Sequence, residues 1–283
     1  MTTQKENDEA GQSVCIYSRN SVQVRRLRSL QTRSGRDATG LYLIEGVRHL
    51  AEAMKHCVRI ETLVVAPKLL ENPLGKKLVR QLRIAGTPCY SLTPEIYHSL
   101  SQAEEPQGVA AVVRQRWEKL EHIRPSHKLC WTAVEAVQSA GNLGTMIRTS
   151  EAVGGAGVLL IGNATDPYNP ATVRASMGAI FAQRFVRAEV EAFLAWKQRH
   201  QVTLVGTSPS ATLDYHAVTY PKCSMLLMGS EKKGLSDVLQ QACDLLVKIP
   251  MVGQVDSLNL GVATSVMLYE LFNQRRASRA NPR

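Results

Sequence analysis

The sequence predicts an α/β protein of two domains, and three observations support this. Its 283 residues are enough for a sizeable core and, by length, for two domains. Strand-like apolar runs alternate with segments of helical spacing, which predicts a mostly parallel sheet covered by helices on both faces. A charged stretch without sustained periodicity, 115–128, is the linker candidate. We expect domains over 13–114 and 129–275, a disordered N-terminus over 1–12 and a basic tail over 276–283.

The first half predicts a small α/β domain that binds and performs no chemistry. Ser18 can cap a helix that carries Val22, Val24, Leu27 and Leu30. Further strands are expected over 41–44, 62–65, 109–113 and around Cys89, with helices over 47–56 and around 74–83. Nothing in this half pairs a nucleophile with a base, so we assign it a binding role.

The polar positions of the first helical region are rich in arginine. Six arginines fall within eighteen residues: Arg19, Arg25, Arg26, Arg28, Arg33 and Arg36. The whole chain carries 34 Lys and Arg against 24 Asp and Glu, a formal charge of +10. Guanidinium groups this close repel one another unless an anion binds among them, which favours a nucleic-acid phosphate backbone, with an anionic membrane surface second. The alternative is a solvated helix face.

The second half alternates regularly between strands and helices. Strands are expected over 129–134, 157–161, 184–187, 202–206, 225–228 and 245–249. Helices are expected over 143–153, 170–177, 189–199 and 235–242, followed by a terminal helix. In the terminal helix, apolar residues at helical spacing predict a buried stripe: Leu258, Val262, Val266, Tyr269 and Phe272.

Polar residues gather at three predicted strand-to-helix junctions. Asn142 and Arg148 belong to the first junction, Glu231 to the second, and Ser257 and Asn259 to the third. In open α/β sheets ligands bind at the carboxyl ends of the strands, and a helix N-terminus offers unpaired N–H groups. Each block alone is also compatible with a helix cap, a turn or a surface arginine.

The three junctions together resemble a known family. The blocks N-L-G-T-M-I-R (142–148), M-G-S-E-K-K-G-L (228–235) and I-P-M-V-G-Q-V-D-S-L-N (249–259) are similar to the three motifs of the SpoU/TrmH family of RNA ribose 2′-O-methyltransferases, within the SPOUT superfamily. The resemblance spans most of 129–273. The first half, with S-R-N at 18–20 and E-P-Q-G at 105–108, resembles the ribosomal-protein-like RNA-binding domain of many members.

The resemblance implies methyl transfer from S-adenosyl-L-methionine to a ribose 2′-hydroxyl, without a metal. It also implies a C-terminal trefoil knot and an active site formed across a homodimer. The residues expected around the reacting ribose are Asn142, Arg148, Glu231, Ser257 and Asn259. The residues expected to contact the cofactor are Thr207, Gly229, Ile249, Met251 and Leu258. The residues expected to bind RNA are Arg19, Arg25, Arg26, Arg36 and Arg48.

Several alternatives stay open on sequence alone. Ribosomal RNA is the expected substrate and transfer RNA the second, while a non-catalytic RNA-binding or ribosome assembly factor could share the fold. The family's second motif commonly reads G-S-E-G, whereas Lys232 and Lys233 follow Glu231 here and add positive charge at the edge of the site. A guanidinium scarcely deprotonates, so Arg148 is expected to act as a cation rather than as the base.

Composition limits the expected cellular compartment of the protein and the kinds of site that it can contain. No apolar run is long enough to cross a bilayer, and the first twelve residues do not look like a signal sequence, which predicts a cytoplasmic protein. The six cysteines are far apart and contain no C-x-x-C pair. We therefore expect neither a zinc site nor a catalytic thiol.

Overall fold

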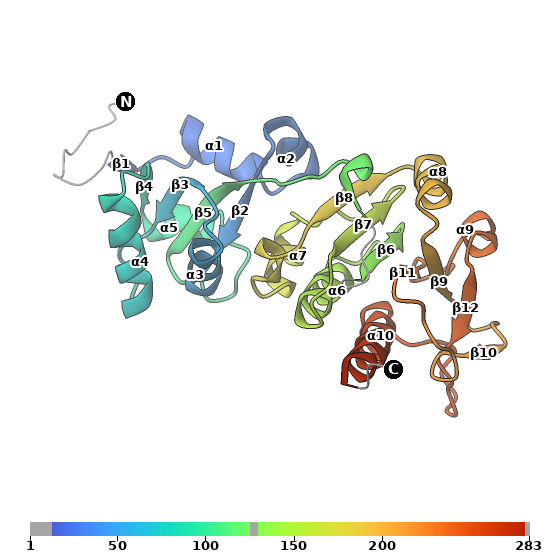
Figure 1. The fold of residues 1–283 in the computed structure, drawn as a ribbon. Helices are drawn as coiled ribbons and strands as arrows, with labels where there is room; N and C mark the ends of the chain where they lie inside the picture. Colours follow the sequence, from blue (N-terminus) through green and yellow to red (C-terminus); the bar gives the residue numbers. More distant parts are fainter. Residues whose placement is uncertain (1–12, 125–129, 281–283) are drawn as a thin grey trace. The chain divides into compact units, whose positions relative to one another are not determined.

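The computed structural model describes residues 13–124 and 130–280, with side chains up to position 277 (Figure 1). The expected disordered stretch 1–12, the last linker residues 125–128 and the tail end 281–283 lie outside this range, as does position 129. The chain forms two compact units. The N-terminal unit comprises the residues up to Gln115 together with 168–181, and the C-terminal unit comprises 116–167 and the residues from Ala182 onward.

The N-terminal unit is built on a five-stranded mixed sheet. Its order is β1 (Ser13–Ile16), β4 (Cys89–Leu92), β3 (Ile60–Val65), β5 (Val109–Arg114) and β2 (Leu41–Glu45). β1, β4 and β3 run parallel, whereas β5 is antiparallel to β3 and to β2. The four expected strands are confirmed. The sequence analysis missed β1, a four-residue edge strand too short to show an alternating pattern.

The helices of this unit begin at capping side chains that their sequences supply, except for the helix that starts after Gly46. They are α1 (Val22–Ser29), α2 (Arg33–Thr39), α3 (Val47–Lys55), α4 (Pro73–Ile84) and α5 (Pro94–His98). The expected cap of α1 was wrong, because Ser21 and not Ser18 accepts a hydrogen bond from the Val24 N–H, at 3.2 Å. Val24, Leu27 and Leu30 are buried as expected, but Val22 is exposed.

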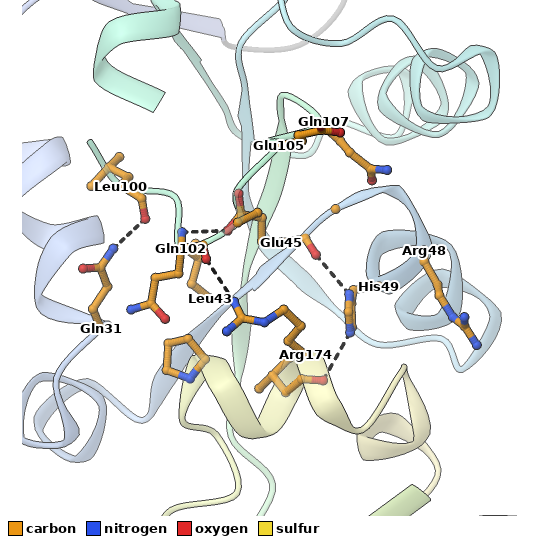
Figure 2. Close-up of a pocket in the computed structure, with 14 residues that line it drawn as sticks. Gln31, Leu43, Glu45, Arg48, His49, Leu100, Gln102, Glu105, Gln107 and Arg174 are labelled. Carbon is orange, nitrogen blue, oxygen red and sulfur yellow. Dashed lines mark hydrogen bonds between the residues drawn. The ribbon is translucent and has the colours of Figure 1, made fainter. Parts of the chain in front are cut away.

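Residues 168–181 pack on the N-terminal unit although the sequence analysis placed them in the second domain. This segment contains α7 (Pro170–Ala175). The rings of Tyr42 and Tyr168 lie 4.6 Å apart between centroids. The buried His49 faces two carbonyl oxygens, with Nδ1 3.0 Å from that of Glu45 and Nε2 3.2 Å from that of Val173 (Figure 2). These contacts explain why the segment clusters with the strand β2 and the helix α3.

The C-terminal unit is built on a seven-stranded sheet, and the expected parallel arrangement is confirmed. Its order is β10 (Leu213–Asp214), β12 (Leu245–Lys248), β9 (Thr203–Thr207), β11 (Ser224–Met228), β6 (Trp131–Glu135), β7 (Gly157–Ile161) and β8 (Phe185–Ala188). Every neighbouring pair is parallel. The central strand β11 is buried along its whole length, which explains its unbroken apolar sequence.

Helices cover both faces of this sheet. One face carries α6 (Ala140–Ala152) and α10 (Leu260–Ala280), and the other carries α8 (Val190–His200), α9 (Asp237–Gln241) and the short helix η1 (Leu120–His122). Phe193 and Trp196 of α8 lie in the core together with Leu120 and Ile123. Residues 116–124 of the expected linker therefore belong to the C-terminal unit, whereas Gln115 belongs to the N-terminal one. No helix within the described ranges has the length and apolar character needed to cross a membrane.

The buried face of α10 differs from the one that we expected. The residues that it buries are Thr264, Met267, Leu268 and Leu271. Val262 and Tyr269, members of the expected stripe, are 48% and 47% exposed, and Leu258 precedes the helix at 36%. The prediction was wrong because apolar residues occur on both sides of this helix, so periodicity alone could not choose the inner one.

The chain returns from β12, which lies next to the edge strand β10, to the middle of the sheet, where α10 packs against α6. Segment 215–222 holds α10 in place. Gln274 donates to the Val218 carbonyl at 2.8 Å and accepts from the Tyr220 N–H at 3.0 Å. Arg275 donates to the Lys222 carbonyl at 2.9 Å. This return is the part of the chain where the family resemblance places the trefoil knot.

We predict that His49→Gln flattens the pH dependence of thermal stability. Burial, with smaller contributions from Arg48 and Arg174, lowers the pKa of His49 below its ordinary value. As pH falls, the His49 side chain is therefore protonated in the unfolded chain before it is protonated in the folded protein. The contribution of His49 to the free energy of unfolding is complete above about pH 6.5 and is lost as pH falls through the folded-state pKa.

The measurement is the Tm, followed by circular dichroism at about pH 7.5 and about pH 5.5. The Tm should fall more for the wild type than for His49→Gln. His98→Gln, at an exposed histidine of the same unit, serves as the control and should behave like the wild type. Equal falls in the wild type and in His49→Gln would contradict the prediction.

Candidate active site

A cavity of about 520 Å³ lies at the carboxyl ends of β9, β11 and β12. Its volume is in the range of pockets that enclose small-molecule ligands, about 300–1,000 Å³. Nine of the ten residues expected around the ribose or the cofactor line it: Asn142, Thr207, Gly229, Glu231, Ile249, Met251, Ser257, Leu258 and Asn259. The three sequence blocks thus converge on one cavity.

Side-chain hydrogen bonds join the three blocks directly. The Asn142 amide Nδ2 donates to the Glu231 carboxylate at 3.1 Å, and the Asn259 amide Nδ2 donates to Asn142 Oδ1 at 2.9 Å. Asn259 Oδ1 accepts from the N–H of Gly261 at 2.9 Å and so caps the start of α10. Each asparagine therefore uses both ends of its amide, which fixes its orientation at the cavity wall.

The Glu231 carboxylate also anchors the loop before α6. Its two oxygens accept from the N–H groups of Ser139, at 3.0 Å, and Gln138, at 3.1 Å. Burial alone would raise the pKa of Glu231, but the hydrogen bonds from Ser139, Gln138 and Asn142 outweigh it and lower the pKa below its ordinary value. Glu231 is therefore a carboxylate whose hydrogen bonds hold Asn142 and the two residues that precede α6.

The sequence analysis did not identify Ser139 as part of the site. Ser139 Oγ accepts from the Asn142 N–H at 3.2 Å and caps α6. Its own N–H holds Glu231, so it connects the helix start to the second block. A serine just before a predicted helix is a typical N-cap, and this pattern could have identified Ser139 from the sequence.

Gly229 permits a close approach of two backbone segments. A Cβ at this position would lie 2.0 Å from the Gly234 carbonyl carbon and 2.2 Å from the Leu235 nitrogen. Ser230 and Gly234 pair across this turn, donating to each other's carbonyls at 2.9 and 3.0 Å. Any side chain at 229 would therefore displace the loop that forms one wall of the cavity.

The lining of the cavity combines polar and apolar groups. Met228, Leu235 and Leu260 supply apolar surface, while Ser208 and Gln240 supply donors and acceptors. The Thr207 hydroxyl lies 3.6 Å from the Met228 sulfur. Lys232 and Lys233 also line the cavity and are exposed, so the departure from the usual motif places two positive charges at its edge.

Arg148 is the one expected site residue that does not line this cavity. It is exposed on α6, beside the contact with α10, where Thr149 and Ser265 share a hydrogen bond of 2.9 Å. Among the residues that the structure describes, Arg148 forms no hydrogen bond or ion pair. Its guanidinium is therefore available to a group outside this chain.

The expected RNA-binding arginines divide into surface and core residues. Arg19, Arg25, Arg26 and Arg48 are exposed, and Arg19 also donates to the Glu95 carbonyl at 3.3 Å. Arg36, however, is only 1% exposed.

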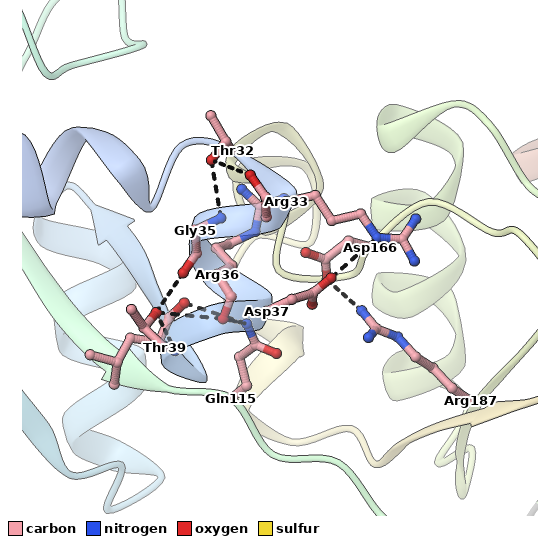
Figure 3. Close-up of polar contacts among 11 residues, drawn as sticks. Thr32, Arg33, Gly35, Arg36, Asp37, Thr39, Gln115, Asp166 and Arg187 are labelled. Atoms are coloured by element: carbon pink, nitrogen blue, oxygen red, sulfur yellow. Dashed lines mark hydrogen bonds and ion pairs between the residues drawn. The ribbon is translucent and has the colours of Figure 1, made fainter.

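The expectation for Arg36 needs correction. Its Nη1 donates to the carbonyl of Leu30, at the end of α1, at 3.0 Å, and Gln115 Nε2 donates to the Arg36 carbonyl at 3.0 Å (Figure 3). The side chain thus satisfies a helix C-terminal carbonyl inside the unit and does not reach a surface where RNA could bind.

The residues around the cavity contain no evident metal site. Within 13–124 and 130–280, no three or more His, Cys, Asp or Glu side chains are grouped so that they could hold a metal ion.

The sequence matches two family models. The SpoU rRNA Methylase family matches residues 132–269, and the MRM3-like substrate binding domain matches residues 21–111. The two matches fall on either side of the expected linker.

Relatives and solved structures resemble the chain over nearly its whole length. The 23S rRNA (uridine(2479)-2′-O)-methyltransferase of Streptomyces viridochromogenes is 30% identical, over 93% of this chain and 93% of its own. The 23S rRNA (guanosine(2553)-2′-O)-methyltransferase of Bacillus subtilis is also 30% identical, over 90% of this chain and 98% of its own. The crystal structure of an AdoMet-bound rRNA methyltransferase from Sinorhizobium meliloti has a TM-score of 0.85 and 32% identity, covering 93% of this chain and 98% of that one.

We predict that Gly229→Ala destabilises the protein, because the added Cβ meets backbone atoms that have no room to move. Overpacking of this kind typically costs about 1–3 kcal/mol. Gly253→Ala is the matched control, since a Cβ there meets nothing within 4 Å. Thermal unfolding should show a lower Tm for Gly229→Ala and a wild-type Tm for Gly253→Ala. Equal Tm values for the two variants would count against the close packing described at Gly229.

Proposed function

Because the chain belongs to the SpoU/TrmH family and is an S-adenosylmethionine-dependent RNA 2′-O-ribose methyltransferase, we propose that it methylates one nucleotide of 23S-type ribosomal RNA. The observation that carries the proposal is the convergence of the three motif blocks on one cavity, joined through Glu231, Asn142 and Asn259. Ribosomal RNA is favoured over transfer RNA because the two relatives described above, which span at least 90% of this chain, are named for 23S rRNA.

The cavity suits the family's cofactor. Its lining has the mixed character that a nucleoside joined to an amino acid requires, and its volume is adequate. The residues proposed to hold the cofactor are Thr207, Gly229, Ile249, Met251 and Leu258, mainly through main-chain groups. When bound, S-adenosylmethionine supplies a methyl group on a sulfonium centre, which is already strongly activated.

The work left to the protein is to align the ribose and to help remove one proton. Asn142, Asn259 and Glu231 are held rigidly enough to position the ribose hydroxyls, with Ser257 beside them. Arg148 is proposed as a cation that lowers the pKa of the 2′-hydroxyl and clamps the neighbouring phosphate. The proton then passes to that phosphate or to water, because a guanidinium scarcely accepts or releases protons.

We also propose that the protein acts as a homodimer, with Arg148 of the partner subunit completing each site. Arg148 does not line the cavity of its own chain. Around the same helices the single chain exposes apolar side chains, including Val262 and Tyr269 on α10 and Val252 and Val255 in the loop before it. Exposed apolar groups gathered in this way are typical of an interface. Because ribosomal RNA is the proposed substrate, we place the protein in the cytoplasm.

We predict that the purified protein transfers tritiated methyl groups from S-adenosylmethionine to 23S rRNA taken from cells that lack the gene. Mapping of 2′-O-methylation should show one nucleotide gained. DNA of the same sequence should stay unmethylated, because it lacks the 2′-hydroxyl. Methylation of transfer RNA alone would contradict the proposed substrate. Cofactor binding without transfer to any RNA would point to the non-catalytic alternative.

A mixing experiment tests the shared site. Arg148→Ala and Gly229→Ala should each be inactive when expressed alone. If Arg148 serves the partner's cavity, co-expression restores one intact site in each mixed dimer, giving about a quarter of wild-type activity for random pairing. Methyl transfer per protein is the measurement. Both variants are first shown to be folded by circular dichroism at the assay temperature. Activity of the folded mixture no higher than that of the separate variants would then show that Arg148 acts on its own chain's cavity.

A further inference from the structure

A second cavity, of about 230 Å³, lies within the N-terminal unit and plays no part in the proposed methyl transfer (Figure 2). It is bounded by the junction of β2 and α3, by residues 100–107 and by α7. It is smaller than the pockets of about 300–1,000 Å³ that enclose drug-sized ligands, so its occupant would be a smaller group.

One edge of this cavity is rich in hydrogen-bond acceptors and amides. The Glu45 carboxylate accepts from the Ser101 hydroxyl and, at 3.3 Å, from the Gln102 N–H. The Tyr97 hydroxyl also interacts with this carboxylate. A carboxylate has about four lone-pair positions, so Glu45 keeps capacity for a further donor. The side chains of Gln31 and Gln102 also line the cavity, and Gln31 Nε2 donates to the Leu100 carbonyl at 2.5 Å (Figure 2).

Apolar groups form the walls of the cavity. Leu43 comes from β2, Leu100 from the loop after α5, and Pro170 and Val173 from α7. The cavity is therefore lined by apolar side chains as well as by the polar groups described above. A nucleobase has apolar faces and a polar edge, so a cavity lined by both kinds of group suits it.

Two arginine side chains bring positive charge to the same cavity. Arg48 and Arg174 both line it and are exposed, and Arg174 Nη1 donates to the Gln102 carbonyl at 3.3 Å. Among the described residues neither guanidinium pairs with a carboxylate, although Glu45 and Glu105 line the same cavity. Unpaired guanidiniums beside a cavity favour binding of an anion such as phosphate.

We propose that this cavity, here called the base pocket, takes a single unstacked guanine nucleotide of the substrate RNA. The base lies between the apolar walls and its N1–H and amino group donate to Glu45, while a backbone phosphate meets Arg48 or Arg174. Unstacked bases are read in this way by RNA-binding proteins, through their Watson–Crick edges. Uracil fits less well, because it offers the Glu45 carboxylate one donor, N3–H, flanked by two carbonyl oxygens, whereas guanine offers two adjacent donors. That RNA supplies the nucleotide rests on the proposed function.

The base pocket lies in the N-terminal unit, whereas the cavity proposed for methyl transfer is lined by the C-terminal unit. Losing the base pocket should therefore weaken binding of RNA without changing the chemical step. The expected signature is a higher KM for 23S rRNA at nearly unchanged kcat.

The first experiment titrates guanosine and uridine 5′-monophosphates into the full-length protein, followed by calorimetry. Guanosine monophosphate should bind at least about tenfold more tightly than uridine monophosphate, the size of effect that one well-matched base contact gives. Adding 23S rRNA should displace it. Equal binding of the two nucleotides, or none of the guanosine nucleotide, would overturn the proposal. Failure of RNA to compete would overturn the assignment of the pocket to RNA.

Variants then separate the base pocket from the rest of the protein. Ala103→Phe fills the cavity, and Ala85→Phe, at an exposed alanine after α4, is its control. Arg174→Ala removes one charge without adding bulk, and Arg80→Ala, at an exposed arginine of α4, is its control. Ala103→Phe should abolish binding of guanosine monophosphate, whereas binding of S-adenosylmethionine should stay at the wild-type level and show that the protein is folded.

In the methylation assay, both pocket variants should raise the KM for 23S rRNA, by about tenfold for Ala103→Phe, with kcat within about twofold of the wild type. Both controls should match the wild type. An unchanged KM in both variants would overturn the base pocket while leaving the proposed function intact. Absence of methylation in the wild type would instead refute the proposed function. The titrations with nucleotides alone would then show whether the base pocket binds guanine.

Discussion

The candidate active site depends on one run of hydrogen bonds, from the Glu231 carboxylate through the Asn142 amide to the Asn259 amide. These bonds join residues 89 and 117 positions apart, so they form only after the parallel sheet has brought three strand ends together. Each end of the run is secured by backbone: Glu231 accepts from the N–H of Ser139, and Asn259 accepts from the N–H of Gly261. Groups held in this way need little rearrangement when substrate arrives, which is the main electrostatic advantage of a preorganised site.

The position of the site could be predicted from sequence because it follows from the sheet. Polar residues after β11 and β12 must meet at one edge of a parallel sheet, and the structure places Glu231 and Ser257 there. The role of Arg36 could not be predicted in the same way. Six arginines in eighteen residues look alike in sequence, and only the folded structure shows that Arg36 is buried and donates to the carbonyl of Leu30, whereas Arg25 is exposed. Composition does not reveal such a buried hydrogen bond.

The helix α10 shows a second limit of periodicity. It presents Met267 and Leu271 to its own unit and Val262 and Tyr269 to the surface, so its sequence satisfies two apolar faces at once. The stripe that the sequence suggested is the outer one. In the proposed homodimer, α10 would pack on its own sheet and also meet a second chain, so its sequence would carry both apolar patterns, and choosing between them requires the fold. The same reasoning accounts for Arg148, which has no partner within the described part of its own chain.

The segment 168–181 adds chain connections between the two units and also contributes residues to the base pocket. It belongs to the N-terminal unit although both its ends continue into the C-terminal one, so the chain passes between the units three times, after Gln115, Pro167 and Phe181. Several connections between two binding units raise the effective concentration of one unit's ligand at the other without any new contact. An RNA held in the base pocket would therefore present its other nucleotides to the methyl-transfer cavity at high local concentration. Because Val173 and Arg174 of this segment line the base pocket, loss of α7 from the N-terminal unit would remove the binding contacts and the extra connections together.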